Sequence, residues 1–178
     1  SERVARARRH RKLRTIPGQW LFTDERLGGD RPDDPLWRAL ARLPRGAGIV
    51  FRHYGWAPAR RLALLHRIEQ LARRRGLIVV SSRIRPASGG VHRPGGSRAL
   101  ARRGLVTASA HDARALHAAF AAGADLVFLS PVFATRSHPG APALGPVRFG
   151  LIARGAPGPV IALGGMTAAR ARRLAALG

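Results

Sequence analysis

The chain has 178 residues, enough for one domain with a buried core, and 46% of them are hydrophobic, which excludes a disordered protein. It has 32 Lys and Arg residues against 9 Asp and Glu residues, a formal net charge of +23, and the lack of Cys excludes disulfide frameworks and thiolate sites. No apolar run approaches the roughly 18 residues of a membrane span, so we expect a cytoplasmic protein without a membrane segment.

The basic residues are dense at one place only, in residues 1–17, which we interpret as a basic N-terminal tail ending at Pro17. Most other Arg residues are spread along Ala/Leu-rich stretches, where their stems cover apolar surface and their charges face water. Aromatic residues are not interleaved with the basic ones, so nucleic acid is not the expected partner. A small-molecule substrate is expected instead, and a homo-oligomer is compatible with the sequence.

Seven short apolar runs follow the tail and are typical of strands that are buried on both faces of a parallel sheet. In chain order they are residues 19–23, 48–52, 77–80, 89–92, 105–109, 126–130 and 160–163. Their spacing leaves room for a helix in most of the connections.

Three helices are predicted most clearly. Residues 57–76 end at Gly76, residues 111–123 have Asp112 as a start signal, and a third helix has Thr167 as its expected N-cap. The apolar positions expected to face the core in the first of them are Leu62, Leu65, Ile68 and Leu71.

Alternation of strands and helices at this spacing predicts an α/β fold, either an open doubly wound sheet or a (β/α)8 TIM-type barrel. The connection at residues 81–88 is too short for a full helix, and no eighth strand is recognisable before Gly178. If the fold is a barrel, it is therefore a trimmed one with seven strands. Residues 18–178 are expected to form this single domain.

Polar residues or glycines follow nearly every predicted strand. In a barrel the carboxyl ends of the strands meet at one face, where the chemistry takes place. The residues at these ends are Thr23, Asp24, Arg52, His53, Ser81, Ser82, His92, Ser109, His111, residues 130–138, Gly164, Gly165 and Thr167. Their convergence predicts a small-molecule site.

The sequence around these ends resembles the thiamine-phosphate synthase/TenI family of (β/α)8 barrels. The resemblance covers about residues 19–178, in order, through five motifs: LFTD, VFRHYG, GGVHRPG, TASAHDARAL followed by AAGADLVFLSPVFATRS, and VIALGGMT. The fourth motif is long and is the most specific of the five. A glycine pair after a strand, as in the last motif, is common among phosphate-binding barrels.

The resemblance implies a reaction that joins an aminopyrimidine diphosphate to a thiazole phosphate and releases diphosphate. Ionisation of the pyrimidine C–O bond places negative charge on the leaving diphosphate, which cationic groups stabilise. Arg52 matches the diphosphate-binding arginine of the family, and Ser109 matches the serine near the pyrimidine. The first function expected is therefore a transferase of thiamine biosynthesis.

The resemblance also implies a phosphate site at the loop after the sixth predicted strand. Thr135 and Ser137 match the two hydroxyl positions of that loop, and His138 stands where the family has lysine. Gly164 and Gly165 match the glycines whose backbone N–H groups approach the phosphate.

The carboxylates that hold Mg²⁺ in the family are replaced. Ser81 and Ser82 stand at the family's Asn-Asp pair, and residues 94–97 replace its Gly-Gln-Asp-Asp segment. Mg²⁺ prefers carboxylate oxygens. Asp24 is the one acidic residue that remains near the carboxyl ends of the predicted strands, so no metal ligand is predicted. Ser81 and Ser82 are kept as expected substrate-binding residues. Val50 and Tyr54 likewise stand where the family has Gln and Lys.

Nucleic-acid association through the Arg-rich tail is one rival. Two further alternatives stay open. The TenI-like branch of the family tautomerises a thiazole without metal or diphosphate, and His111 is its candidate general acid and base here. The other alternative is a non-catalytic homologue that has kept the phosphate site. His92, in a buried segment, is expected to be structural, and Asp24 is expected to cap a turn.

Overall fold

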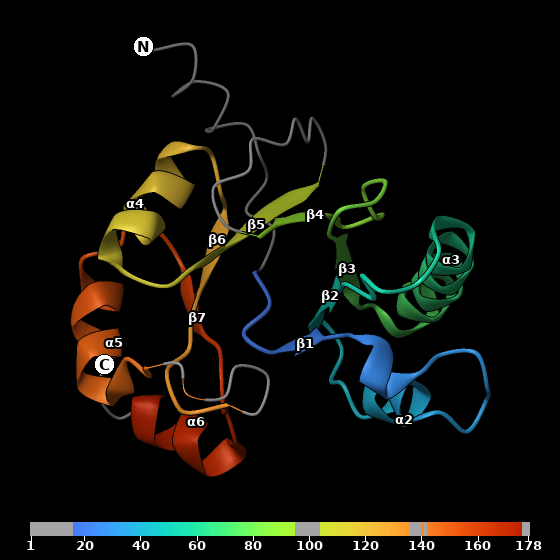
Figure 1. Cartoon of the computed structure of the whole chain (residues 1–178), viewed down its shortest axis with the longest axis horizontal. Coiled ribbons are helices and arrows are strands. Elements are labelled where there is room, and N and C mark those ends of the chain that lie inside the picture. Colours follow the sequence, from blue (N-terminus) through green and yellow to red (C-terminus); the bar gives the residue numbers. More distant parts are fainter. Residues whose placement is uncertain (1–15, 95–103, 136–139, 141, 176–178) are drawn as a thin grey trace.

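The computed structural model describes residues 16–94, 104–135, 140 and 142–175. Seven parallel strands form one curled sheet with the sequential order β1-β2-β3-β4-β5-β6-β7 (Figure 1). The strands are β1 (Trp20–Phe22), β2 (Gly48–Phe51), β3 (Ile78–Ser81), β4 (Gly90–Arg93), β5 (Leu105–Ala110), β6 (Leu126–Leu129) and β7 (Val160–Ala162). A doubly wound sheet reverses its strand order part-way, so the sequential order confirms the trimmed TIM-type barrel.

All seven predicted strands are present, displaced by at most a residue or two at their ends. Residues of β2 and β6 are buried throughout, which is why the sequence shows them as continuous apolar runs. The strands β1 and β7, at the two edges of the sheet, are only half-buried.

The helices lie outside the sheet, with α2 and α3 on one side of the molecule and α4, α5 and α6 on the other (Figure 1). The described helices are η1 (Glu25–Leu27), α2 (Pro35–Ala41), α3 (Pro58–Arg75), α4 (Ala113–Ala121), α5 (Gly145–Arg154) and α6 (Ala168–Ala175). Asp112 caps α4 and the Thr167 hydroxyl accepts a hydrogen bond from the Arg170 N–H of α6, as the sequence predicts. Gly76 ends α3 in the left-handed conformation.

Three apolar clusters hold these layers together. One fills the concave side of the sheet and is built on Val50, Val80, Leu105, Leu126 and Phe128. A second packs α2 and α3 against β2 and β3, and a third packs α4 and α5 against β5 and β6. The first of these clusters lies beneath the polar residues at the carboxyl ends of the strands.

The predicted core face of α3 is partly wrong. Leu65 and Ile68 are fully buried as expected, but Leu62 is 40% exposed. Arg61 and Glu69 are buried on this helix in addition to the apolar residues. Both have polar partners in the strand ends and loops that α3 covers, and these partners offset part of the cost of burying their charges.

The connection between β3 and β4 is confirmed as too short for a helix. Residues 82–89 form a bent loop, which the buried Glu69 carboxylate holds by accepting hydrogen bonds from the Arg85 side chain and the Ser88 N–H, both at 2.6 Å. Burial raises the pKa of Glu69, but these donors outweigh it, and the pKa lies below its ordinary value. A carboxylate of α3 therefore helps to hold the short loop in shape.

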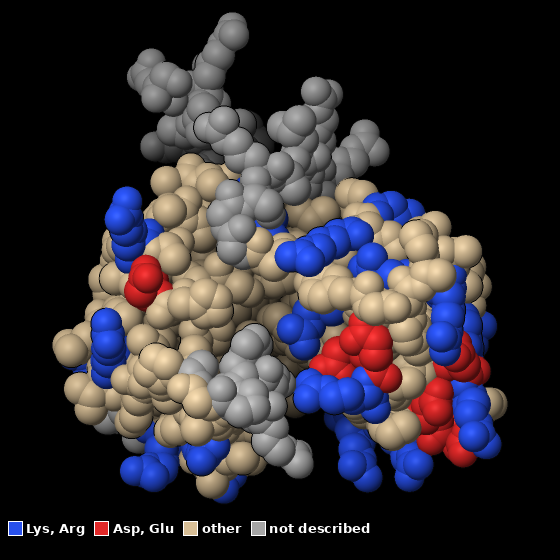
Figure 2. Space-filling model, viewed as in Figure 1, with Lys and Arg blue, Asp and Glu red and all other residues tan. Residues whose placement is uncertain are grey.

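In the described ranges, no helix is long and apolar enough to cross a membrane. Figure 2 shows basic side chains dispersed over the visible face, while acidic side chains gather on the side that carries α2 and α3. The basic surplus of the sequence is thus spread over this face and not concentrated in one stripe. Residues 1–15 of the expected tail lie outside the described residues.

Candidate active site at the strand ends

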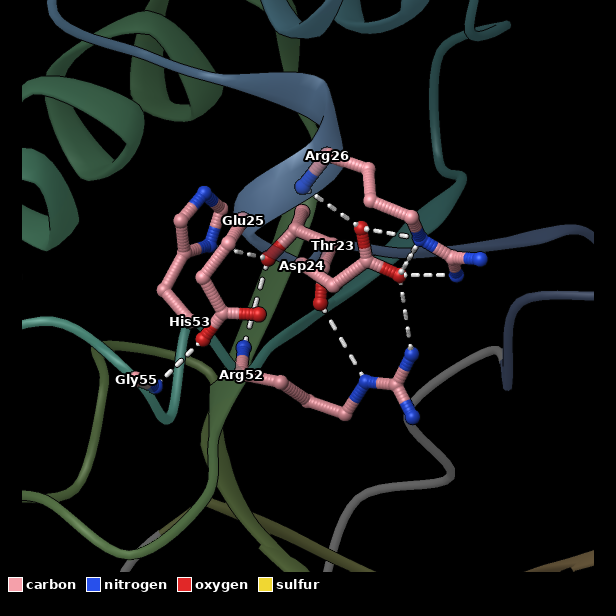
Figure 3. Close-up of polar contacts among 7 residues, drawn as sticks. All are labelled: Thr23, Asp24, Glu25, Arg26, Arg52, His53 and Gly55. Atoms are coloured by element: carbon pink, nitrogen blue, oxygen red, sulfur yellow. Dashed lines mark hydrogen bonds and ion pairs between the residues drawn. The ribbon is translucent and has the colours of Figure 1, made fainter. Parts of the chain in front are cut away.

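Arg52 lies directly after β2 at the carboxyl ends of the strands. Its Nε donates a hydrogen bond to the Thr23 carbonyl oxygen at 3.2 Å, and its Nη2 lies 3.7 Å from the Asp24 carboxylate (Figure 3). The ring of Phe22 lies beneath the guanidinium, 5.2 Å away. The side chain is 30% exposed, so an oriented cation remains accessible at the open end of the sheet.

Asp24 caps η1, as the sequence predicts, by accepting a hydrogen bond from the Arg26 N–H. It also pairs with two guanidinium groups, those of Arg26 and Arg52. The hydrogen bond from the Arg26 side chain, opposed by burial and assisted by the charge of Arg52, holds the pKa of Asp24 below its ordinary value. Asp24 therefore stays ionised and orients Arg52.

A second set of hydrogen bonds, next to Arg52, joins Thr23 to His53. His53 Nε2 lies 2.9 Å from the Gly28 carbonyl oxygen, which can only accept, so Nε2 carries a hydrogen. The Thr23 hydroxyl then donates to His53 Nδ1 and accepts from the Arg52 N–H. Burial lowers the pKa of His53, which keeps the ring neutral and this pattern fixed.

Arg61 of α3 ties the ends of β2 and β3 together. Its Nη2 donates to the carbonyl oxygens of Arg52 and Ser82, both at 2.8 Å, and its Nη1 donates to the carbonyl oxygen of Arg83 at 3.0 Å. The side chain is buried, and its bond to the Ser82 carbonyl oxygen forms away from water. Arg61 thus fixes the backbone from which Arg52 projects.

Ser109 is half-buried on β5 and faces His92 of β4, whose Nε2 lies 3.1 Å from the Ser109 hydroxyl oxygen. His92 is buried between the rings of Phe22 and Phe128, which it meets edge-on. Burial, with a smaller contribution from the positive charge of Arg52, lowers the pKa of His92 to about 3. His92 is therefore neutral, with its Nε2 facing the Ser109 hydroxyl.

His111 follows β5 and is exposed. Its Nδ1 lies 2.7 Å from the Ser130 carbonyl oxygen at the end of β6, so Nδ1 is the donor. In the neutral ring Nε2 is then the basic nitrogen, at the carboxyl end of the strands. This is the form that a general base requires.

Ser81 and Ser82 are both buried, and their hydroxyls have protein partners. The Ser81 hydroxyl donates to the Arg85 carbonyl oxygen and accepts from the Ala87 N–H, so it shapes the β3–β4 loop. The Ser82 hydroxyl accepts a hydrogen bond from the Tyr54 hydroxyl at 2.9 Å. This tyrosine–serine pair stands where the resemblance implies a lysine and an aspartate.

The structure brings Arg52, Ser82, Ser109 and His111 to one end of the sheet. Thr135 lies half-buried beyond β6 on the same side, and Ser137 and His138 lie outside the described residues. Gly164 and Gly165 follow β7 and pack against the loop after β6.

The comparisons with known proteins agree with this geometry. The family model described as thiamine monophosphate synthase, TMP-TENI, matches residues 23–178. The chain belongs to this family. Among solved structures, a thiamine phosphate pyrophosphorylase from Pyrococcus furiosus matches with a TM-score of 0.76 and 20% identity, over 93% of this chain and 84% of that one. At this identity the match supports the TIM-type fold. A search of curated proteins found no match.

In this member of the thiamine monophosphate synthase family, Gly164 and Gly165 have a packing role. A Cβ on Gly165 would lie 2.5 Å from the Ala134 carbonyl oxygen, and one on Gly164 would lie 2.8 Å from Pro131. Both glycines also have positive φ angles, of 93° at Gly164 and 63° at Gly165. Only glycine lets the end of β7 approach the β6 loop this closely.

The described residues of this family member do not fit the Mg²⁺ that the resemblance implies. Asp24 is the acidic residue at the strand ends described above, and two guanidinium groups already occupy its carboxylate. In the part of the chain that the structure describes, no group of three His, Asp or Glu side chains could hold a metal ion. Hard divalent cations require such oxygen-rich sets.

Sequence reasoning missed Arg61 and the partners of His92. Arg61 stands among other helix arginines, and nothing in its local sequence distinguishes it from a surface residue. The Thr-Ala-Ser pattern of β5 could have indicated that Thr107 and Ser109 share a face. The residue opposite them is set by the β4–β5 register, which pairs His92 with Thr107.

Proposed function

We propose that the chain binds a phosphorylated heterocycle at the carboxyl ends of its strands and acts as a thiamine-phosphate synthase-like transferase. In the proposed reaction an aminopyrimidine diphosphate is coupled to a thiazole phosphate, and diphosphate leaves. The observation that carries this proposal is Arg52, an accessible guanidinium oriented by the Thr23 carbonyl and the Asp24 carboxylate in a member of this family.

Arg52 has the charge and position that the departing diphosphate requires. As the pyrimidine C–O bond ionises, negative charge grows on the leaving group, and a preoriented cation stabilises that charge without reorganising. Arg61 supports this role, because it holds the Arg52 backbone in place. Thr135, Ser137, His138, Gly164 and Gly165 remain the proposed contacts to the thiazole phosphate, and Ser81 and Ser82 remain proposed substrate neighbours.

A second function, metal-independent tautomerisation of a thiazole phosphate, is favoured by one observation. The Nδ1–H of His111 is committed to the Ser130 carbonyl, which leaves Nε2 as the nitrogen that can take and return a proton. Such a reaction needs one group of this kind and no leaving diphosphate.

The test measures thiamine phosphate formed by the full chain from aminopyrimidine diphosphate and thiazole phosphate, with and without Mg²⁺. The wild type is expected to form product, and Arg52→Met is expected to lower kcat by about a hundredfold or more, the usual effect of losing a preoriented electrostatic contact. Arg73→Met is the matched control, because Arg73 is exposed on α3.

Two results would change the assignment. Binding of thiazole phosphate without product in either condition would remove the transferase and leave the tautomerase or a binding protein. Equal product from the wild type and Arg52→Met would remove Arg52 from the mechanism. Interconversion of thiazole isomers, followed by NMR on the same samples, separates the tautomerase from a non-catalytic binder.

A further inference from the structure

His92 lies in a chain of hydrogen bonds that crosses the interior of the barrel from β4 to β5. Its Nδ1 lies 2.9 Å from the Thr107 hydroxyl oxygen, and its Nε2 lies 3.1 Å from the Ser109 hydroxyl oxygen. The Thr107 hydroxyl in turn lies 3.4 Å from the Val91 carbonyl oxygen. Thr107 is fully buried and His92 is 4% exposed, so the chain is closed to water at this end.

The carbonyl at one end gives the chain a direction. A carbonyl oxygen only accepts, so the Thr107 hydroxyl donates to Val91 and accepts from the Nδ1–H of His92. The neutral ring then has an unprotonated Nε2, and the Ser109 hydroxyl donates its hydrogen to that nitrogen. The reverse direction would take the Thr107 hydrogen away from Val91.

The surroundings hold the ring neutral and in place. Phe22 and Phe128 flank it, each with its ring centroid 5.6 Å away, and Arg52 is the charged group that acts on it. The pKa of His92, about 3, makes its Nε2 a poor general base near neutral pH. The contact between His92 and Ser109 therefore orients a hydrogen and does not activate a nucleophile.

We propose that Thr107 and His92 are positioning residues that point the Ser109 hydrogen away from the ligand, so that Ser109 offers only an acceptor oxygen and selects a ligand N–H donor such as a ring amino group. This inference rests on the proposed function, with Ser109 beside the pyrimidine as the family resemblance implies. An ionised phosphate has only acceptor oxygens, so it is excluded from Ser109 and belongs at Arg52. The site thus has an acceptor at Ser109 and a cation at Arg52.

The direction of the hydrogen bonds from Val91 to Ser109 is tested without any ligand. Nitrogen-15 NMR of the imidazole rings of the full chain distinguishes protonated from unprotonated nitrogens, and His92→Gln assigns the signals among the seven His residues. We expect a protonated Nδ1 and an unprotonated Nε2 at pH 7. A protonated Nε2 in the wild type would overturn the proposal.

The selectivity is tested by comparing aminopyrimidine diphosphate with an analogue that has hydrogen in place of the amino group. The wild type is expected to bind the amine about tenfold more tightly, the effect of roughly one hydrogen bond. Thr107→Val keeps the shape but removes the hydroxyl, and is expected to abolish the preference, as is Ser109→Ala. Thr107→Ser keeps the hydroxyl and is expected to retain the preference.

Arg52→Met separates this inference from the proposed function. It is expected to weaken both ligands by the same factor and to leave the tenfold preference unchanged. A wild type that binds neither compound would defeat the proposed function and the donor selectivity with it, while the NMR result decides the direction of the chain. A wild type that binds both, with the same preference in Thr107→Val, would overturn this inference and leave the proposed function standing.

Discussion

The guanidinium of Arg61 donates a hydrogen bond to the backbone carbonyl of Arg52 at 2.8 Å, so one arginine of α3 holds the backbone that carries the arginine at the site. The same Nη2 also reaches the Ser82 carbonyl at the end of β3. Both carbonyl oxygens can only accept hydrogen bonds, so they cannot bond to each other. The Arg61 side chain supplies the donor that links them. The geometry of the site consequently depends on a residue that need not touch the ligand.

Arg61→Met is expected to lower the free energy of unfolding by about 2–4 kcal/mol, because three carbonyl oxygens lose a charged donor from a buried side chain while the apolar stem is kept. Urea unfolding followed by circular dichroism measures the change. Arg73→Met, at an exposed position of the same helix, is expected to leave the unfolding midpoint unchanged. Equal midpoints for the wild type and Arg61→Met would contradict the structural role.

Glu69→Gln is expected to destabilise the protein by about 1–3 kcal/mol at pH 7, since the buried carboxylate loses its charge-assisted bonds from Arg85 and Ser88. The pKa of Glu69 is lowered in the folded protein from the ordinary value of 4.5. Its contribution is therefore fully present above about pH 4.5 and is lost as the pH falls through the lower folded-state pKa. The stability difference between wild type and variant should shrink in acid, and a difference that grows in acid would refute this account.

The positions of the strands and of the residues at their carboxyl ends were predictable from the sequence, because both follow from the local sequence pattern. A strand buried on both faces is a continuous apolar run, and the residue after it, such as Arg52 or His111, must lie at the shared carboxyl edge. Asp112 and Thr167 were likewise predictable, because a capping side chain acts within its own helix turn.

The burial of Arg61 and the partners of His92 were not predictable, since both depend on residues far away in the chain. Arg61 is buried because carbonyls of two strands meet above α3, whereas Leu62, beside it, is left exposed. His92 meets Thr107 because of the register between β4 and β5. The hydrophobic periodicity of a single helix or strand predicts neither the burial of Arg61 nor the contact between His92 and Thr107.

Gly165→Ala is expected to lower the free energy of unfolding by about 1–3 kcal/mol, because the residue has a positive φ and its Cβ would lie 2.5 Å from the Ala134 carbonyl oxygen. Gly150→Ala is the matched control. Gly150 lies inside α5 with open space around its Cα, so alanine there is expected to stabilise the helix by about 0.5–1 kcal/mol. Thermal unfolding of both variants should show opposite signs, and a neutral Gly165→Ala would contradict the close packing of β7 on the β6 loop.

His111→Gln tests the second candidate function. If Nε2 of His111 moves the proton in thiazole tautomerisation, its loss is expected to lower the isomerisation rate by about 10²–10⁴-fold, the range for a positioned general acid or base. The exposed position of His111 predicts an unchanged unfolding midpoint, so lost activity would not reflect lost structure. NMR of the isomer mixture over time measures the rate, and His66→Gln, at an exposed site on α3, serves as the control. Isomerisation by the wild type that persists at the same rate in His111→Gln would show that another group carries the proton.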